Sequence, residues 1–311
     1  MKKIIIVLLV LSFALVFTSC GSSAKVTKKK AEKKDIELIP QTANLIAEAN
    51  ISDFLKIEKL KTYLDKELKK NMPKKVAISL DDLKHVTFFS KIEDPKGLKT
   101  KPNFGFLLRG NNLTEDLLKK LLKDSEELKH NGNNIFKTKD ASGLSLVKNV
   151  LVGGTLENTK KVLDLSKNKG KAVDKKVFQE TFKSLNMSSA KMAMIVTPKF
   201  KESLVLALQK LPLPIGGLNV TLEKLEVIAM GSTVTDTHIK FKIMLKSDKD
   251  AVVALSASLT ALIRMLASKA DELESKAKGA KESFESIKFG AEGNYFVSSI
   301  TVPISLINDI K

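Results

Sequence analysis

The alternation of short strand-like segments with helical segments constrains the fold of this chain more than any other feature of its sequence. Ala43–Ile51 and Asn103–Arg109 are short and mainly apolar, as buried strands are. Leu117, Leu118 and Leu121 follow at the spacing of an amphipathic helix. Short strands interspersed with such helices predict an α+β fold, in which helices pack on a mostly antiparallel sheet.

The order of these segments recurs in the second half of the chain. Leu80 and Leu83 enclose charged residues and precede a strand, and Leu222 and Leu225 do the same. Each half is predicted as strand, helix, strand, strand, helix, strand, with one further strand at its end. A recurring order of elements is the signature of an internal repeat. The sequence therefore predicts two tandem α+β units, which share a continuous sheet or face each other around a groove.

Three expected elements are specific enough to be compared with a structure. Thr114–Lys129 is predicted as one long helix, because leucines recur along it and Asn131-Gly132 follows as a C-terminal stop signal. Leu144–Val152 is expected as one strand. A second long helix is expected from Asp250 to about Lys278.

The first twenty residues carry a different pattern. Met1-Lys2-Lys3 is basic, residues 4–17 are apolar, and Thr18-Ser19 precede Cys20, the only cysteine of the chain. A basic start, a short apolar stretch and small residues before a cleavage point are typical of a secretory signal peptide. The apolar stretch is shorter than the about 20 residues that span a bilayer.

The position of Cys20 resembles the lipobox of bacterial lipoprotein signal peptides. This resemblance implies cleavage before Cys20, a diacylglyceryl thioether on its sulfur and an acylated amino group. Phe17 departs from the pattern, because Leu usually stands three positions before the cysteine. The alternatives are an uncleaved N-terminal anchor, or an ordinary secretory signal that leaves Cys20 as a thiol.

A lysine-rich leader follows the cysteine. Residues 21–35 contain Lys25, Lys28, Lys29, Lys30, Lys33 and Lys34 against two acids, and they show no apolar periodicity. Such a segment is typical of a flexible spacer. Each lysine near an anionic membrane surface adds up to about 1 kcal/mol of binding. The expected partner is therefore a membrane, through the lipid on Cys20 and through this tether, with a lipid or a protein as a further partner of the body.

These patterns predict both the domain organisation and the location. The signal peptide covers residues 1–19, the lipidated tether 20–38, the first α+β repeat 39–185 and the second 186–311. The protein is expected to be exported and lipid-anchored in the cell envelope. Gly21 stands where an aspartate signals inner-membrane retention, so the resemblance favours the outer membrane if the cell has two membranes.

The composition argues against several classes of function. With Cys20 lipidated, no thiol remains for a disulfide, a metal site or a nucleophile. The net charge is +18, yet Arg109 and Arg264 are the only arginines, and nucleic-acid readers depend on arginine. We therefore expect no nucleic-acid partner, and we attribute the lysines to overall composition or to attraction by anionic lipid headgroups.

No motif in the chain predicts chemistry. His85, His130 and His238 do not show a two-histidine metal spacing, and no GxSxG, GxxxxGK[ST] or GxGxxG pattern occurs. His130 is expected near a helix C-terminus, where the helix dipole favours it. The sequence thus predicts no catalytic, cofactor-binding or metal-binding residue, and a non-catalytic interaction module. A hydrolase assembled from scattered residues is the weakest alternative.

The stretch Ala251–Ala267 contains one charged residue, Arg264. An ordinary surface helix has a wide polar face. We interpret the stretch either as a helix buried between the two halves or as the wall of an apolar cavity that holds a lipid or another hydrophobic ligand. In the second case Leu211–Gly217 would form an apolar loop at the cavity mouth. The wall residues would be Leu255, Leu259, Leu262 and Leu266.

Overall fold

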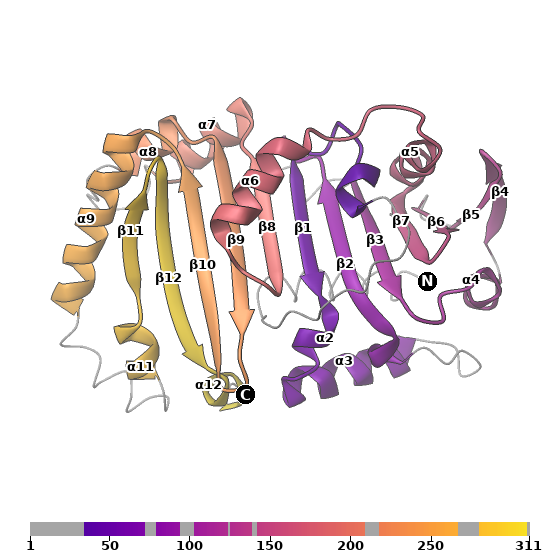
Figure 1. Ribbon diagram of the computed structural model, residues 1–311, viewed down its shortest axis with the longest axis horizontal. Helices are drawn as coiled ribbons and strands as arrows, with labels where there is room; N and C mark the ends of the chain where they lie inside the picture. The colour runs from indigo at the N-terminus through magenta and orange to yellow at the C-terminus, as the bar shows by residue number, and fades with distance from the viewer. Residues whose placement is uncertain are drawn as a thin grey trace. The chain divides into compact units, whose positions relative to one another are not determined.

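The computed structural model describes residues 34–71, 79–93, 103–123, 125–138, 142–208, 218–266 and 280–309. In this part of the chain all strand pairs are antiparallel and helices pack on the sheets, which confirms the predicted α+β class (Figure 1). None of the helices in these ranges combines the length and the apolar character needed to cross a bilayer. The predicted signal peptide, Cys20 and the predicted apolar loop Leu211–Gly217 lie outside the described residues.

The chain divides into two compact units. The described residues of the N-terminal unit are 34–91 and 103–180, apart from the gaps given above, and those of the C-terminal unit are 92–93 and 181–309. The N-terminal unit already includes the short 3-10 helix Asp35–Leu38, which the sequence analysis assigns to the tether.

The sheet of the N-terminal unit has the strand order β1-β2-β3-β7-β6-β5-β4. Its strands are β1 Leu45–Asn50, β2 Leu83–Ser90, β3 Phe104–Gly110, β4 Glu126–His130, β5 Asn133–Lys137, β6 Ser142–Val147 and β7 Val150–Thr155. Its helices are α2 Ile51–Phe54, α3 Glu58–Asn71, α4 Glu115–Leu121, α5 Leu156–Ser166 and the beginning of α6 Lys175–Leu185, with the 3-10 helix η2 Leu80–Asp82 before β2. Helix α5 packs on β6 and β7 and buries the centre of one face, where Leu107 and Val152 are fully buried.

Two sequence predictions in this unit are wrong. The long helix Thr114–Lys129 is the short helix α4 followed by strand β4, and Asn131-Gly132 closes the β4–β5 hairpin instead of ending a helix. Both turn residues have positive φ, 49° and 78°, as a two-residue type I′ hairpin turn requires. The single strand Leu144–Val152 is the hairpin β6–β7, with Lys148 at positive φ in its turn.

The sheet of the C-terminal unit has the order β8-β9-β10-β12-β11. Its strands are β8 Ala190–Ile195, β9 Val227–Val234, β10 His238–Lys246, β11 Lys288–Glu292 and β12 Tyr295–Pro303. Its helices are the end of α6, α7 Pro198–Leu208, α8 Leu218–Glu223, α9 Lys249–Leu266, α11 Ala280–Glu285 and α12 Ile304–Asp309. In each unit the third strand in the chain pairs with the unit's last strand. The structure describes the expected helix Asp250–Lys278 as α9 up to Leu266, and the rest of that range lies outside the described residues.

Side chains of the C-terminal sheet alternate between two different faces. On one face α9 packs through Val252 and Leu255 against Phe296. On the other face the end of α6 lies over β9. This close approach is evident at Gly231, where an added Cβ would be 2.6 Å from Leu185 Cδ2. Gly231 therefore lets α6 and its following loop approach the sheet closely.

We predict that Gly231→Ala lowers the free energy of unfolding by about 2 kcal/mol, the usual cost of overpacking. The added Cβ would lie 3.0 Å from both the Ala190 carbonyl oxygen and Met187 Cβ, neither of which moves easily. Gly290→Ala makes the same change in β11 with no atom within 4 Å, so it should be neutral or stabilising by up to about 1 kcal/mol. Urea unfolding followed by circular dichroism measures both; equal losses would contradict this packing.

Candidate functional site

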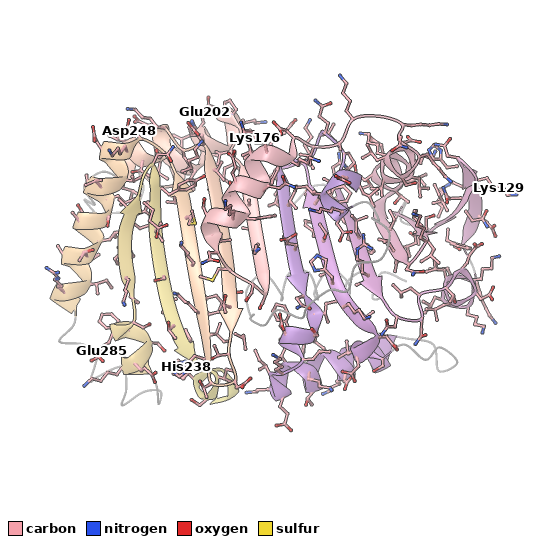
Figure 2. The ribbon with its side chains drawn as sticks, viewed as in Figure 1. Lys129, Lys176, Glu202, His238, Asp248 and Glu285 are labelled. Carbon is pink, nitrogen blue, oxygen red and sulfur yellow. The ribbon has the colours of Figure 1, made fainter. Side chains whose placement is uncertain are left out.

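Helix α9 is held at its beginning by Asp248. The carboxylate of Asp248, labelled in Figure 2, accepts hydrogen bonds from the backbone N–H groups of Asp250 and Ala251 at 3.1 and 3.2 Å, and from Lys224 Nζ at 2.9 Å. The Lys224 ammonium first, and then the Ala251 N–H, hold the pKa of Asp248 below its ordinary value. Because that pKa is lowered on folding, the stability that Asp248 gives is present at neutral pH and is lost only in acid, as pH falls through the lowered pKa.

The predicted wall residues follow one side of α9. Leu255 is 1% exposed and belongs to the core cluster with Val252 and Phe296, and Leu259 packs against the same cluster. Leu262 is half-buried, and Leu266 ends the helix with a side chain outside the description. The opposite side of α9 is exposed but apolar: Val253 is 51% exposed, and its exposed neighbours are Ala254, Ala257 and Ala261.

The sheet face toward α9 carries further apolar side chains that are only partly covered. Strand register places Met192, Met230 and Ile243 in one row across β8, β9 and β10, and Phe241 beside Ile300 on β10 and β12. Ile243 is exposed and the other four are half-buried. Helix α9 packs mainly on β11 and β12. We call these five residues the apolar sheet face.

Neighbouring helices of the C-terminal unit also expose large apolar side chains. Helix α7 contacts α8, and α8 contacts α9. Leu206 on α7, Val220 on α8 and Val253 on α9 are exposed, and they are three of the five large hydrophobic residues that are exposed in the described part of the chain. Exposed apolar side chains on contacting helices are candidates for an interaction site.

A second candidate site is a polar network at the point where the body begins. Asp35 accepts hydrogen bonds from Arg109 Nε at 2.8 Å and from the Thr87 hydroxyl at 3.0 Å, and Arg109 Nη2 lies 2.6 Å from its Oδ1. His85 Nε2 lies 3.2 Å from the Thr87 hydroxyl. Thr87 is buried and the Asp35 side chain is 10% exposed. The network thus fastens the first described residues to strands β2 and β3.

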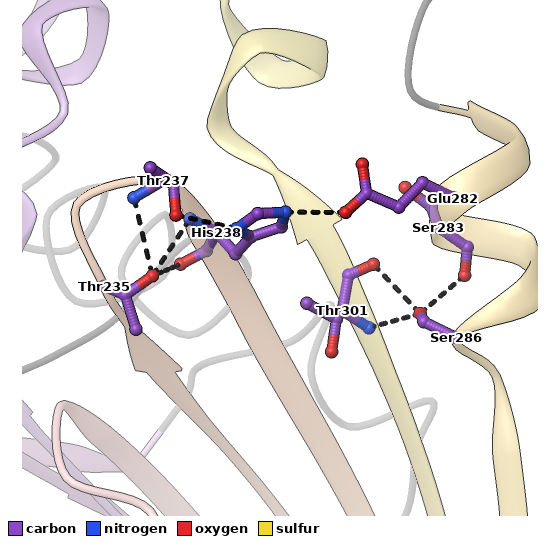
Figure 3. Close-up of polar contacts among 7 residues, drawn as sticks. All are labelled: Thr235, Thr237, His238, Glu282, Ser283, Ser286 and Thr301. Carbon is purple, nitrogen blue, oxygen red and sulfur yellow. Dashed lines mark hydrogen bonds and ion pairs between the residues drawn. The ribbon is translucent and has the colours of Figure 1, made fainter.

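The contacts of His238 resemble the hydroxyl–imidazole–carboxylate arrangement of nucleophilic enzymes. Thr237 Oγ1 lies 2.8 Å from His238 Nδ1, and His238 Nε2 lies 2.8 Å from Glu282 Oε1 (Figure 3). The side chains of His238 and Glu282 are 36% and 59% exposed, so water screens their interaction. Beside them, Ser286 Oγ accepts a hydrogen bond from the Thr301 N–H. We interpret the cluster as a surface link between β10, β12 and α11.

The other histidine environments are also structural. His130 ends strand β4 and not a helix, so the predicted dipole interaction is wrong; its Nε2 lies 2.7 Å from Asp164 Oδ1 on α5. Asn131 donates to the same carboxylate, which ties the β4–β5 turn to α5. In the ranges that the structure covers, no three His, Cys, Asp or Glu side chains gather as metal ligands would.

Comparison with known proteins gives a structural likeness. No protein-family model matches the chain, and neither does any curated protein. Crystal form I of TP0453 superposes with a TM-score of 0.50 at 11% identity, over 89% of this chain and 96% of that one. The fold is similar to that of TP0453. Form III gives a TM-score of 0.49 at 10% identity, over 89% and 97% of the two chains.

We predict that Asp35→Ala lowers the free energy of unfolding by about 2 kcal/mol, because it removes the carboxylate that accepts hydrogen bonds from Arg109 Nε and from the buried Thr87 hydroxyl. Asp81→Ala is the matched control, since its exposed carboxylate pairs with Lys61 at 3.4 Å and should contribute less than about 1 kcal/mol. Urea unfolding compares the two. Losses of the same size would show that the network adds no more than a surface ion pair.

Proposed function

We propose that the chain is an exported lipoprotein of the cell envelope, anchored by acyl chains on Cys20, whose body is a non-catalytic interaction module. The observation that carries the proposal is the position of the only cysteine, directly after a basic start, a short apolar stretch and two small residues. Acyl chains combined with a lysine-rich segment make a strong two-signal anchor.

The N-terminal unit supports this role through the network around Asp35. An anchored body needs a firm connection where the tether enters it. Asp35 is the second described residue, and its carboxylate is bound by side chains of two adjacent strands. The network therefore fixes the point where the proposed tether enters the body to two paired strands of the sheet.

The non-catalytic assignment is supported by the histidines. Each of the three lies against a neighbouring carboxylate or hydroxyl, and each is half-exposed. General acid–base and nucleophilic catalysis depend on groups held in a water-poor site with matched pKa values. The surroundings of these side chains suit surface links between elements.

We predict that Cys20→Ser abolishes acylation and blocks cleavage of residues 1–19, because the thioether must form before the lipoprotein signal is cut. Cells that express the chain are labelled with tritiated palmitate, and the product is weighed by mass spectrometry. The parent should carry label on a shortened chain, and the variant should be unlabelled and longer by the signal peptide.

Ser22→Ala is the control, since it changes a nearby hydroxyl and leaves the cysteine, and it should be labelled like the parent. An unlabelled parent, or a Cys20→Ser variant that keeps its label, would reject the anchor.

A second function, the carriage of a lipid or another hydrophobic ligand, is favoured by the apolar sheet face. Met192, Met230 and Ile243 stand in one row and are not fully buried, and Leu259 and Leu262 lie on the helix at the same side of the sheet. Ligand sites of this class are lined mainly by apolar side chains. This function is compatible with the anchor.

For a carrier, we predict that native mass spectrometry of the purified Cys20→Ser chain shows a bound lipid at one-to-one ratio. Ile243→Asp should reduce its occupancy at least tenfold, because a carboxylate on the apolar sheet face is costly to bury. Tyr63→Asp, which makes the same charge change at an exposed apolar residue of the N-terminal unit, is the control and should keep the lipid. A lipid-free mass would reject stoichiometric carriage.

A further inference from the structure

The sheet face opposite α9 carries an aligned row of lysines. Lys191 on β8 and Lys242 on β10 are both register partners of Gly231 on β9. Lys242 and Lys288 on β11 are both partners of Ser299 on β12. Residues directly opposite each other on antiparallel strands point to the same face. The three lysines therefore stand on one face, about 10 Å apart, since two strand spacings separate each from the next.

A fourth lysine extends this row into a patch. Lys240 lies two residues before Lys242 on β10, so it shares the face, and it stands between Thr233 and Thr301 on the flanking strands. Lys240 and Lys288 are exposed, and Lys191 is half-buried. We call Lys191, Lys240, Lys242 and Lys288 the lysine face.

Much of this face is uncovered. In the view of Figure 1, the end of α6 crosses β9, whereas β10, β12 and β11 are in full sight. A Cβ added to Gly290, which stands two residues after Lys288 on β11, would meet no atom within 4 Å. The side chains of Lys240 and Lys288 are thus accessible from the side of the sheet that α9 does not occupy.

Most of the positive charge on this face is not neutralised. Lys242 lies 3.4 Å from Glu292 and is only 13% exposed. In the described part of the chain, Lys191, Lys240 and Lys288 make no ion pair. Three uncompensated lysines on one side of a sheet produce a positive potential that attracts an anionic partner.

We propose that the lysine face binds the anionic phospholipid headgroups of the membrane to which the chain is anchored. Lysines act as hydrated point charges without the fixed geometry of arginine, which suits many mobile headgroup charges better than a folded partner. Hydroxyls of Ser299 and Thr301 stand beside the lysines as additional hydrogen-bond donors. The proposal rests on the proposed function, because anchoring at Cys20 supplies the membrane.

The length of the tether brings the face within reach of that surface. Residues 20–34 span at most about 50 Å even when fully extended. A body held that close meets the headgroups at a high effective concentration. Each lysine near an anionic surface strengthens binding by roughly fivefold. Even a low affinity of the lysine face for headgroups is therefore enough to hold the body against the membrane.

The test measures partition into vesicles with residues 21–311, which lack both Cys20 and the apolar stretch of residues 4–17, so that neither an acyl chain nor that stretch contributes. Vesicles of phosphatidylcholine alone are compared with vesicles that contain phosphatidylglycerol as well. The readout is the ratio of the two partition coefficients at low and at high salt. The parent should prefer anionic vesicles at least tenfold at low salt, and high salt should remove most of that preference.

The variant Lys191→Gln, Lys240→Gln and Lys288→Gln should lose at least tenfold of this ratio. The control set Lys120→Gln, Lys129→Gln and Lys167→Gln removes the same charge from exposed positions of the N-terminal unit, and should lose less than threefold. Circular dichroism and urea unfolding confirm that both sets fold. Glutamine is used because it keeps side-chain length without introducing repulsion.

Three results would overturn the proposal. Equal losses for the two sets would assign binding to net charge alone, and equal partition of the parent into both vesicles would remove the anionic preference. Binding of labelled polyglutamate that depends on the lysine face, without vesicle binding, would identify an acidic protein segment instead. The palmitate experiment tests the anchor separately. An unlabelled Cys20 would reject the anchor and would leave the vesicle result unchanged.

Discussion

Antiparallel register is the constraint on which the rest of this structure depends. Successive side chains of a strand point to opposite faces, and paired strands keep that alternation in step. In β10 the lysines at 240, 242 and 246 alternate with Phe241, Ile243 and Leu245. Pairing with β9 and β12 extends both sets sideways. A shift of one residue would exchange the lysine face with the apolar sheet face.

Sequence patterns predicted the strands better than the turns. Apolar segments placed β1 and β3 within about two residues, because a buried strand must be apolar over several positions. Asn131-Gly132 was misjudged because the same pair ends helices and closes hairpins, and only its pairing partners distinguish the two. The leucines before it occupy positions that suit either a helix or a short helix followed by a strand.

The candidate surfaces show a similar limit. The pattern around Cys20 that predicts an export signal can be read from twenty consecutive residues. The lysine face cannot, because Lys191, Lys242 and Lys288 come from strands that are far apart in the sequence and adjoin only through β9 and β12. Leu255, expected in an apolar wall along α9, is buried in a core cluster. Small apolar residues form the outer side of that helix.

The network around Asp35 also determines how the body bears load. If the chain is held at its N-terminus, tension on the tether enters through Asp35 into β2 and β3. Within its unit, each of these strands is hydrogen-bonded on both sides. A force applied at a free edge peels a sheet one hydrogen bond at a time, whereas a force applied to strands bonded on both sides loads many bonds together. The body should therefore resist pulling from its tether better than pulling from an edge strand such as β4.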